Sequence, residues 1–178
     1  MPITPLHMGP GLAMKALAGR HFSLTVFAFS QVAIDIEPLV RIVREDAILH
    51  GFTHTYIGAT AVALASLIVG RPVCQFLLRY WNPDPSSALL NWLPAPKTIP
   101  WSAAIAGAFA GTYSHVFLDS IMHADMQPMA PFSEENAWLY FIGVDSLQLL
   151  CALAGAIGVL SMFAVFRVRR RADARKRA

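Results

Sequence analysis

The sequence has few charged residues. Asp, Glu, Lys and Arg make up 14% of its 178 residues, whereas 56% are hydrophobic. Soluble domains average about 25% charged residues. Intrinsic disorder needs the opposite balance, low hydrophobicity and high charge, so a disordered chain is excluded. Cysteine is also scarce, and the two that are present, Cys74 and Cys151, exclude a disulfide-rich scaffold.

The net charge of +3 comes from one end of the chain. Residues 167–178 hold seven Arg and Lys and one acid, Asp173, while the first 166 residues hold seven bases and ten acids. The basic character therefore belongs to a tail, and the composition of the body gives no indication of a nucleic-acid partner. We predict a single membrane-embedded helical domain over residues 1–166, followed by a basic tail over 167–178.

Three long stretches contain no Asp, Glu, Lys or Arg: Ala47–Gly70, Thr98–Leu118 and Ser146–Phe166. They are 24, 21 and 21 residues long. A helix that rises 1.5 Å per residue needs about 20 residues to cross the hydrocarbon core of a bilayer. Each stretch is therefore long enough to span a membrane. Between the first two, we predict a loop of turns and short interfacial helix over Arg71–Pro100, because it is rich in proline, tryptophan and tyrosine.

Two shorter apolar segments precede these spans. Met8–Leu17 and His21–Ile34 are each too short to cross a bilayer comfortably, and Gly19-Arg20 separates them. They predict a helical hairpin, which is either re-entrant or made of two short tilted spans. The predicted fold is therefore all-α: a multi-span transmembrane helical bundle of three full spans plus this N-terminal hairpin.

Histidine and aspartate residues gather at the ends of the predicted spans. His54 lies near the start of the first long stretch, and His115 and Asp119 lie at the end of the second. His7 and Asp35 flank the hairpin. Because the second stretch returns to the side that the first leaves, all five side chains are expected at one membrane face.

The residue types indicate metal chemistry. His115 and Asp119 are four residues apart, so both point from one face of a helix. Imidazole nitrogen and carboxylate oxygen suit Zn²⁺ and similar divalent ions. We predict a site for one or two divalent ions, with Zn²⁺ preferred, built from His7, Asp35, His54, His115 and Asp119. His123 can join it only if the helix ends near Met122, and its role is left open.

Four short motifs resemble those of a bacterial family of inner-membrane, metal-dependent hydrolases of the YdjM type. The segment from His50 to His54 is similar to the family's HRGxTHS motif, although His50 stands where the family has Arg. The segment from Ser114 to Asp119 is similar to its SHxxxD motif. The other two likenesses are of Ala33–Glu37 to a PDxD motif and of His7 with Gly11 to an HxxxG motif. A fainter likeness, in the order of the same ligand types, is to zinc-dependent phospholipase C.

The resemblance implies an enzyme, a membrane-bound metal-dependent hydrolase acting on a phosphoester or another lipid-linked substrate. A metal ion would lower the pKa of its bound water and polarise the bond to be cleaved. Glu37 or His50 would then act as the catalytic base. The alternative is a non-catalytic membrane protein, a metal-binding scaffold or an ion conductor. Conduction is disfavoured, because ionisable groups would then occur at several depths along the spans.

The basic tail predicts the orientation in the membrane. Lys and Arg are enriched in the cytoplasmic flanks of spans. We therefore expect a bacterial inner-membrane protein with a cytoplasmic C-terminus. Counting spans backward from the tail places the His/Asp group on the extracytoplasmic side. The lipid bilayer is the expected partner.

Overall fold

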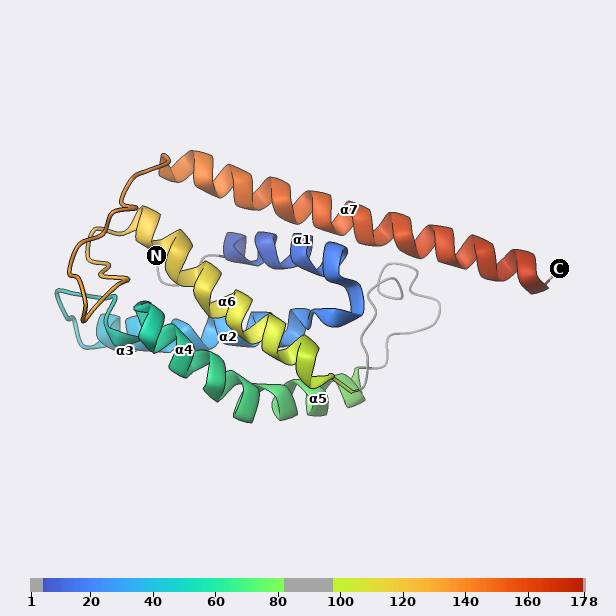
Figure 1. The fold of residues 1–178 in the computed structure, drawn as a ribbon, viewed down its shortest axis with the longest axis horizontal. Coiled ribbons are helices and arrows are strands. Elements are labelled where there is room, and N and C mark those ends of the chain that lie inside the picture. The colour runs from blue at the N-terminus through green and yellow to red at the C-terminus, as the bar shows by residue number, and fades with distance from the viewer. Residues whose placement is uncertain (1–4, 82–97, 178) are drawn as a thin grey trace.

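The computed structural model describes residues 5–81 and 98–177, and within these ranges the chain is all-helical, as predicted. The helices in chain order are η1 (Pro5–His7), α1 (Met8–Ala18), η2 (Gly19–His21), α2 (Leu24–Ile34), α3 (Ile36–Val43), η3 (Phe52–His54), α4 (Tyr56–Ala65), η4 (Ser66–Gly70), α5 (Arg71–Tyr80), α6 (Trp101–Met122) and α7 (Val144–Arg177). The long helices lie side by side, and α7 extends beyond the others toward the C-terminus (Figure 1).

The predicted N-terminal hairpin is confirmed. Helices α1 and α2 have 11 residues each and are joined at Gly19, whose φ of 53° suits glycine. Lys15 closes the turn, since its Nζ donates hydrogen bonds to the carbonyls of Gly19 and Phe22 over 2.8 and 2.7 Å. Ser23 caps α2 by accepting a hydrogen bond from the N–H of Val26. In the bundle α1 packs on α7, and α2 packs on α6.

The first long helix differs from its predicted bounds. It runs from Tyr56 to Tyr80 through α4, η4 and α5, instead of from Ala47 to Gly70. Thr55 starts the helix, because its Oγ1 accepts a hydrogen bond from the N–H of Gly58 over 3.0 Å. Pro72 does not end it, because the π turn η4 lies just before the proline and takes up the disturbance of the helical hydrogen bonds.

The short helix predicted within the loop Arg71–Pro100 is present over the first ten residues as α5, but it continues the long helix instead of forming a separate interfacial segment. Residues 82–97 of that loop lie outside the described residues. The predicted boundary between the membrane domain and the basic tail, after residue 166, does not coincide with the end of a helix. Helix α7 continues without a break as far as Arg177.

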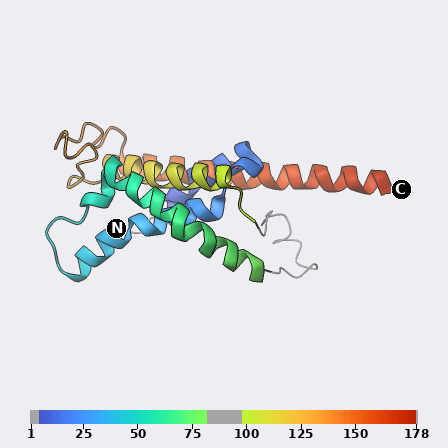
Figure 2. The ribbon, with the colours of Figure 1, turned by 60° about the horizontal axis from the view of Figure 1, so that its bottom comes forward.

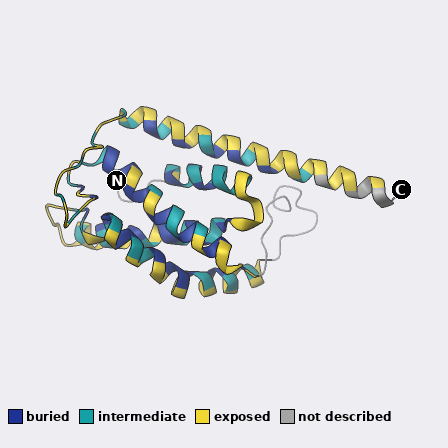
Figure 3. Cartoon of the chain, viewed as in Figure 1, coloured by how far each residue is buried: buried dark blue, intermediate teal, exposed yellow. Residues whose placement is uncertain are grey.

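Two helices in the described part of the chain are long and apolar enough to cross a membrane: Tyr56–Tyr80 and Val144–Ala172. The remaining predicted span, Thr98–Leu118, corresponds to α6, which has 22 residues but does not meet the same test. It carries Thr112, His115 and Asp119 on its buried side. The outward faces of the two apolar helices carry large hydrophobic side chains, such as Ile68 and Leu160, and these faces suit lipid (Figure 3).

Several helix termini and the connections between them lie together at one end of the molecule. The start of α1, the junction of α2 with α3, the start of α4, the end of α6 and the start of α7 all lie at the end away from the C-terminus (Figures 1 and 2). The turn of the hairpin lies toward the other end. This arrangement decides which polar side chains meet.

Candidate metal centre at one end of the bundle

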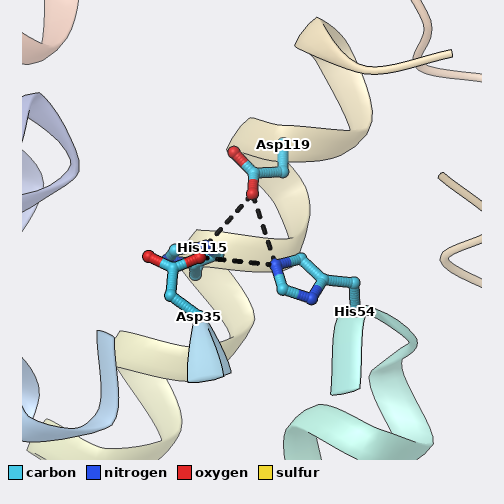
Figure 4. A group of neighbouring side chains, drawn as sticks. All are labelled: Asp35, His54, His115 and Asp119. Carbon is cyan, nitrogen blue, oxygen red and sulfur yellow. Dashed lines mark ion pairs between the residues drawn. The ribbon is translucent and has the colours of Figure 1, made fainter. Parts of the chain in front are cut away.

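The structure brings together the five residues that the sequence predicts as metal ligands. His7 ends η1, Asp35 joins α2 to α3, and His54 ends η3, while His115 and Asp119 lie one turn apart on α6. All five side chains are buried. Four of them, shown in Figure 4, form a compact group in which one ligand atom of each lies within 4.8 Å of the others: Asp35, His54, His115 and Asp119.

Asp119 lies at the middle of the centre. Its Oδ2 is 3.1 Å from His115 Nε2 and 3.5 Å from His54 Nε2. The Oδ1 of Asp35 is 3.1 Å from His115 Nε2 and 3.7 Å from His54 Nε2. Ligands on a tetrahedral ion with bonds of ~2.1 Å are about 3.4 Å apart. The observed separations lie on both sides of that value, so one ion can sit among these four side chains with small adjustments.

Three of the four ligand atoms have no hydrogen-bond partners among the described residues. Asp35 Oδ1, His54 Nε2 and His115 Nε2 are buried without a donor or acceptor in hydrogen-bond geometry, and so is His7 Nδ1. Unpaired buried polar atoms are costly and therefore rare. Here three of them point toward the same space from three separate elements. A divalent cation would satisfy all three at once.

Gln31 fixes the ring of His115. The Nε2 of Gln31 donates to the carbonyl of Gly111 over 3.1 Å, so its Oε1 is left as an acceptor. That oxygen lies 2.6 Å from Nδ1 of His115. Nδ1 of His115 therefore donates to Gln31, and Nε2 faces Asp35 and Asp119, where it can bind an ion. A metal-binding histidine is usually oriented in this way by an acceptor behind it.

Thr53 and Glu37 fix the ring of His54 in the same manner. The hydroxyl of Thr53 donates to Glu37 Oε2 over 2.7 Å, and its oxygen lies 3.1 Å from His54 Nδ1. His54 Nδ1 then donates to Thr53, which leaves Nε2 free for an ion. Glu37 is itself held by Arg41, with Arg41 Nη2 2.8 Å from Glu37 Oε1. Burial alone would raise the pKa of Glu37, but the hydrogen bonds from Thr53 and Arg41 lower it.

Glu37 and His50, which the sequence predicts as catalytic, lie outside the four-residue group. The carboxylate of Glu37 is engaged by Thr53 and Arg41. His50 lies in an irregular segment before η3, and it does not share a helix face with His54. Its Nδ1 is 2.8 Å from Asp125 Oδ1, and its Nε2 is 4.0 Å from Asp119 Oδ2.

A second group of ligand types borders the first. It consists of His50, His123 and Asp125. Helix α6 ends at Met122, so His123 can turn back toward the centre, where its ring stacks on His50 with 4.4 Å between centroids. Burial alone would raise the pKa of Asp125, but hydrogen bonds from the His50 ring and backbone and from the Leu49 N–H lower it to about 2. Asp125 is therefore a charged acceptor for His50.

His7 completes the rim of the centre. Its Nε2 is 3.7 Å from Asp119 Oδ1, and its ring contacts His115 edge-on with 5.0 Å between centroids. Burial lowers the pKa of His7 to about 4. The imidazole is therefore neutral near pH 7, which is the form that binds metal ions.

Sequence reasoning missed the residues that orient the histidines. Gln31, Thr53 and Asp125 act through hydrogen bonds, and two of these join residues 75 and 84 positions apart. No spacing rule links such distant positions. The sequence offered only two hints of these roles: Thr53 is next to His54, and Asp125 is close to His123.

Comparisons with known proteins give two relatives with the same name. The chain is similar to the molybdate/tungstate transport system permease protein WtpB of Pyrococcus abyssi, with 26% identity over 170 residues, 84% of this chain and 68% of the relative. It is also 31% identical over 133 residues to the protein of that name from Thermococcus kodakarensis. That match covers 73% of this chain and about half, 52%, of the relative. No family model matches the chain, and no solved structure matches it.

These relatives contradict the prediction of a metal-dependent hydrolase. Both are named as transport permeases, so the resemblance to YdjM-type hydrolases and to phospholipase C is wrong as a guide to activity. The expectations of an enzyme and of a lipid-linked substrate fall with it, whereas the roles given to Glu37 and His50 stay predictions. The motifs that carried the resemblance encode ligand geometry, and ligand geometry alone does not specify a reaction.

Proposed function

We propose that this chain is a membrane component of a transport system and that its buried centre holds a resident divalent metal ion, with Zn²⁺ the best match. The observation that carries the metal site is the convergence of Asp35 Oδ1, His54 Nε2 and His115 Nε2, all buried and without hydrogen-bond partners, around Asp119. The similarity to two transport permeases carries the assignment to transport.

The charge of the centre favours a cation. Asp35 and Asp119 contribute two negative charges, and two neutral imidazoles that bind an ion through Nε2 would contribute none. A divalent ion balances this charge, and nitrogen with carboxylate oxygen is a ligand set that Zn²⁺ favours. An oxyanion such as molybdate would meet two buried carboxylates and no fixed positive charge. The oxyanion in the relatives' name therefore does not fit this centre.

The ion would join separate parts of the fold. Asp35, His54 and His115 come from the α2–α3 junction, η3 and α6, and the apolar cluster around Ile34 and Val116 also packs at this end of the bundle. Binding that occurs in the folded state stabilises it. The metal would thus set the geometry of this end of the membrane protein.

The membrane placement follows from the basic tail. We place the protein in the plasma membrane, the inner membrane of a bacterial cell, with its C-terminus in the cytoplasm. Because the metal centre lies at the end of the bundle away from the tail, it would face the outside (Figure 1). The lipid bilayer and the other proteins of a transport system would be its partners.

Metal analysis of the purified protein tests the site. His115→Ala and Asp119→Ala should each lose bound zinc, while His21→Ala should keep it, because His21 lies at the hairpin turn. Circular dichroism must show that all three remain helical. Equal zinc in all of them would refute the proposed site.

Uptake by cells tests the transport assignment separately. Cells that lack this chain should take up less molybdate or tungstate, the cargo in the relatives' name, and the wild-type chain should restore uptake. Zinc uptake serves as the comparison, because a resident ion predicts no change in it. Unchanged uptake of both oxyanions would refute the transport assignment and leave the metal site to the first test.

A further inference from the structure

The two carboxylate oxygens of Asp119 face different sets of histidines. Oδ2 lies 3.1 Å from His115 Nε2 and 3.5 Å from His54 Nε2, which belong to the centre already described. Oδ1 lies 3.7 Å from His7 Nε2 and 3.9 Å from His123 Nε2. One buried carboxylate thus separates two groups of imidazole nitrogens.

We propose that the centre is dinuclear, with a second divalent ion bound by His7, His123 and Asp119 Oδ1, and with Asp119 bridging the two ions. This inference rests on the metal site proposed above and adds a second position to it. The first ion takes Oδ2 of Asp119 with Asp35, His54 and His115, and the second takes Oδ1.

The separations around the second position are somewhat longer than those around the first. Separations of 3.7 and 3.9 Å from Oδ1 to the two nitrogens exceed a hydrogen bond, and they approach the spacing of about 3.4 Å between ligands on a tetrahedral ion. His7 is buried, so an ion bound through its Nε2 would be shielded from bulk solvent. Two ions bridged by one carboxylate would be about 3.5–4 Å apart, as in known two-metal sites.

The surroundings of His123 support the same assignment. The end of α6 at Met122 lets His123 turn back over the centre, and its ring is stacked on that of His50. Asp125 holds His50 through a hydrogen bond of 2.8 Å to Nδ1. His123 therefore rests on an oriented ring instead of moving freely in solvent. With three ligands from the chain, the second ion would keep one position open to water or another small ligand.

Charge also favours a shared carboxylate. Two divalent ions close together repel each other, and a bridging carboxylate between them reduces this repulsion by lying near both charges. Asp119 is 4% exposed, so water does not screen its charge. Asp35 adds a second carboxylate on the side of the first ion. The first position therefore has more negative charge and should bind more tightly than the second.

The test is the number of metal ions per chain in purified, folded variants loaded with Zn²⁺. Wild type should hold two ions. His123→Ala and His7→Ala should each hold one, whereas Asp119→Ala should lose both. Gln127→Ala is the matched control near the same end, because this side chain is exposed, and it should hold two.

Loading with Mn²⁺ adds a readout that does not depend on counting ions. Two bridged Mn²⁺ ions are magnetically coupled, so wild type should give the broad electron paramagnetic resonance spectrum of a pair. His123→Ala should give the hyperfine pattern of an isolated ion. His123→Asn, a conservative replacement, should retain at most a weak second ion and keeps the test valid if the alanine variant misfolds.

The outcomes separate the two proposals. If wild type holds one ion, and this ion is kept in His123→Ala but lost in His115→Ala, the dinuclear centre is overturned and the single site stands. No bound ion in wild type overturns both. Two ions with an unchanged count in His7→Ala and His123→Ala would place the second ion elsewhere and overturn this assignment.

Discussion

His115 and Asp119 lie one turn apart on α6, with Nε2 of the histidine 3.1 Å from Oδ2 of the aspartate. The i,i+4 spacing holds both side chains on one face of a rigid helix. Asp35 and His54, by contrast, come from a helix junction and a single turn of 3₁₀ helix. The centre therefore has one half on a single rigid helix, α6, and one half whose two ligands come from separate short elements.

Replacing Gln31 with methionine should weaken metal binding without unfolding the protein. Gln31→Met keeps most of the side-chain volume but removes the oxygen that holds His115 Nδ1 at 2.6 Å. Loss of such an orienting partner reduces metal affinity by roughly 10–100-fold. Competition with a fluorescent zinc chelator measures the effect. Gln127→Met, at an exposed position, should behave as wild type, and an equal loss in both variants would contradict the role of Gln31.

Replacing Thr53 with valine should have a similar effect on the other half. Thr53→Val removes the hydroxyl that links Glu37 to His54 and is nearly the same shape. We expect zinc affinity to fall by roughly tenfold or more, because His54 would no longer be held with Nε2 toward the ion. Thr60→Val is the control, since Thr60 bonds to Tyr113 on α6 outside the centre. An affinity unchanged by Thr53→Val would show that His54 needs no orienting partner.

Replacing Gly9 with alanine should destabilise the contact of α1 with α7. A Cβ at Gly9 would collide with the carbonyl of Cys151, so the two helices would have to separate. Overpacking of this kind costs about 1–3 kcal/mol. The midpoint of thermal unfolding in detergent should fall, and zinc should bind more weakly, because His7 lies two residues away. Gly143→Ala, where a Cβ would meet only Ser146 Oγ at 4.0 Å, should leave both quantities unchanged.

Single cysteines test the orientation in the membrane. After replacement of Cys74 and Cys151 by alanine, Glu134→Cys lies at the end of the metal centre and His21→Cys lies at the hairpin turn; both positions are exposed. A thiol reagent that does not cross membranes should label intact cells at Glu134→Cys and should label His21→Cys only after the cells are opened. The reverse pattern would place the metal centre in the cytoplasm.

The sequence predicted much of the fold because hydrophobic runs and breaks are local signals. The hairpin turn at Gly19 and the return of α6 to the side from which α4 starts could both be read from the order of uncharged segments. The start of the first long helix could not. Ala47 begins an uncharged run, but the hydroxyl cap of Thr55 starts the helix, and a cap outweighs composition at a helix end.

The ligands could be predicted, but the residues that support them could not. The i,i+4 spacing of His115 and Asp119 is visible in the sequence. The hydrogen bond between His50 and Asp125 is not, because the two residues are 75 positions apart. Such a contact is a property of tertiary packing. Activity was the least predictable part, because the same histidines and carboxylates serve enzymes, structural sites and transport proteins alike.

X-ray absorption at the zinc edge of the purified wild-type protein tests the metal centre itself, since it reports the atoms bound to the ion. We expect a first shell of nitrogen and oxygen at ~2.0–2.1 Å, with the outer-shell scattering of imidazole rings and without sulfur. His115→Ala should reduce the imidazole signal or abolish bound zinc. A shell containing sulfur at ~2.3 Å, or zinc with no imidazole scattering in the wild type, would contradict the proposed centre.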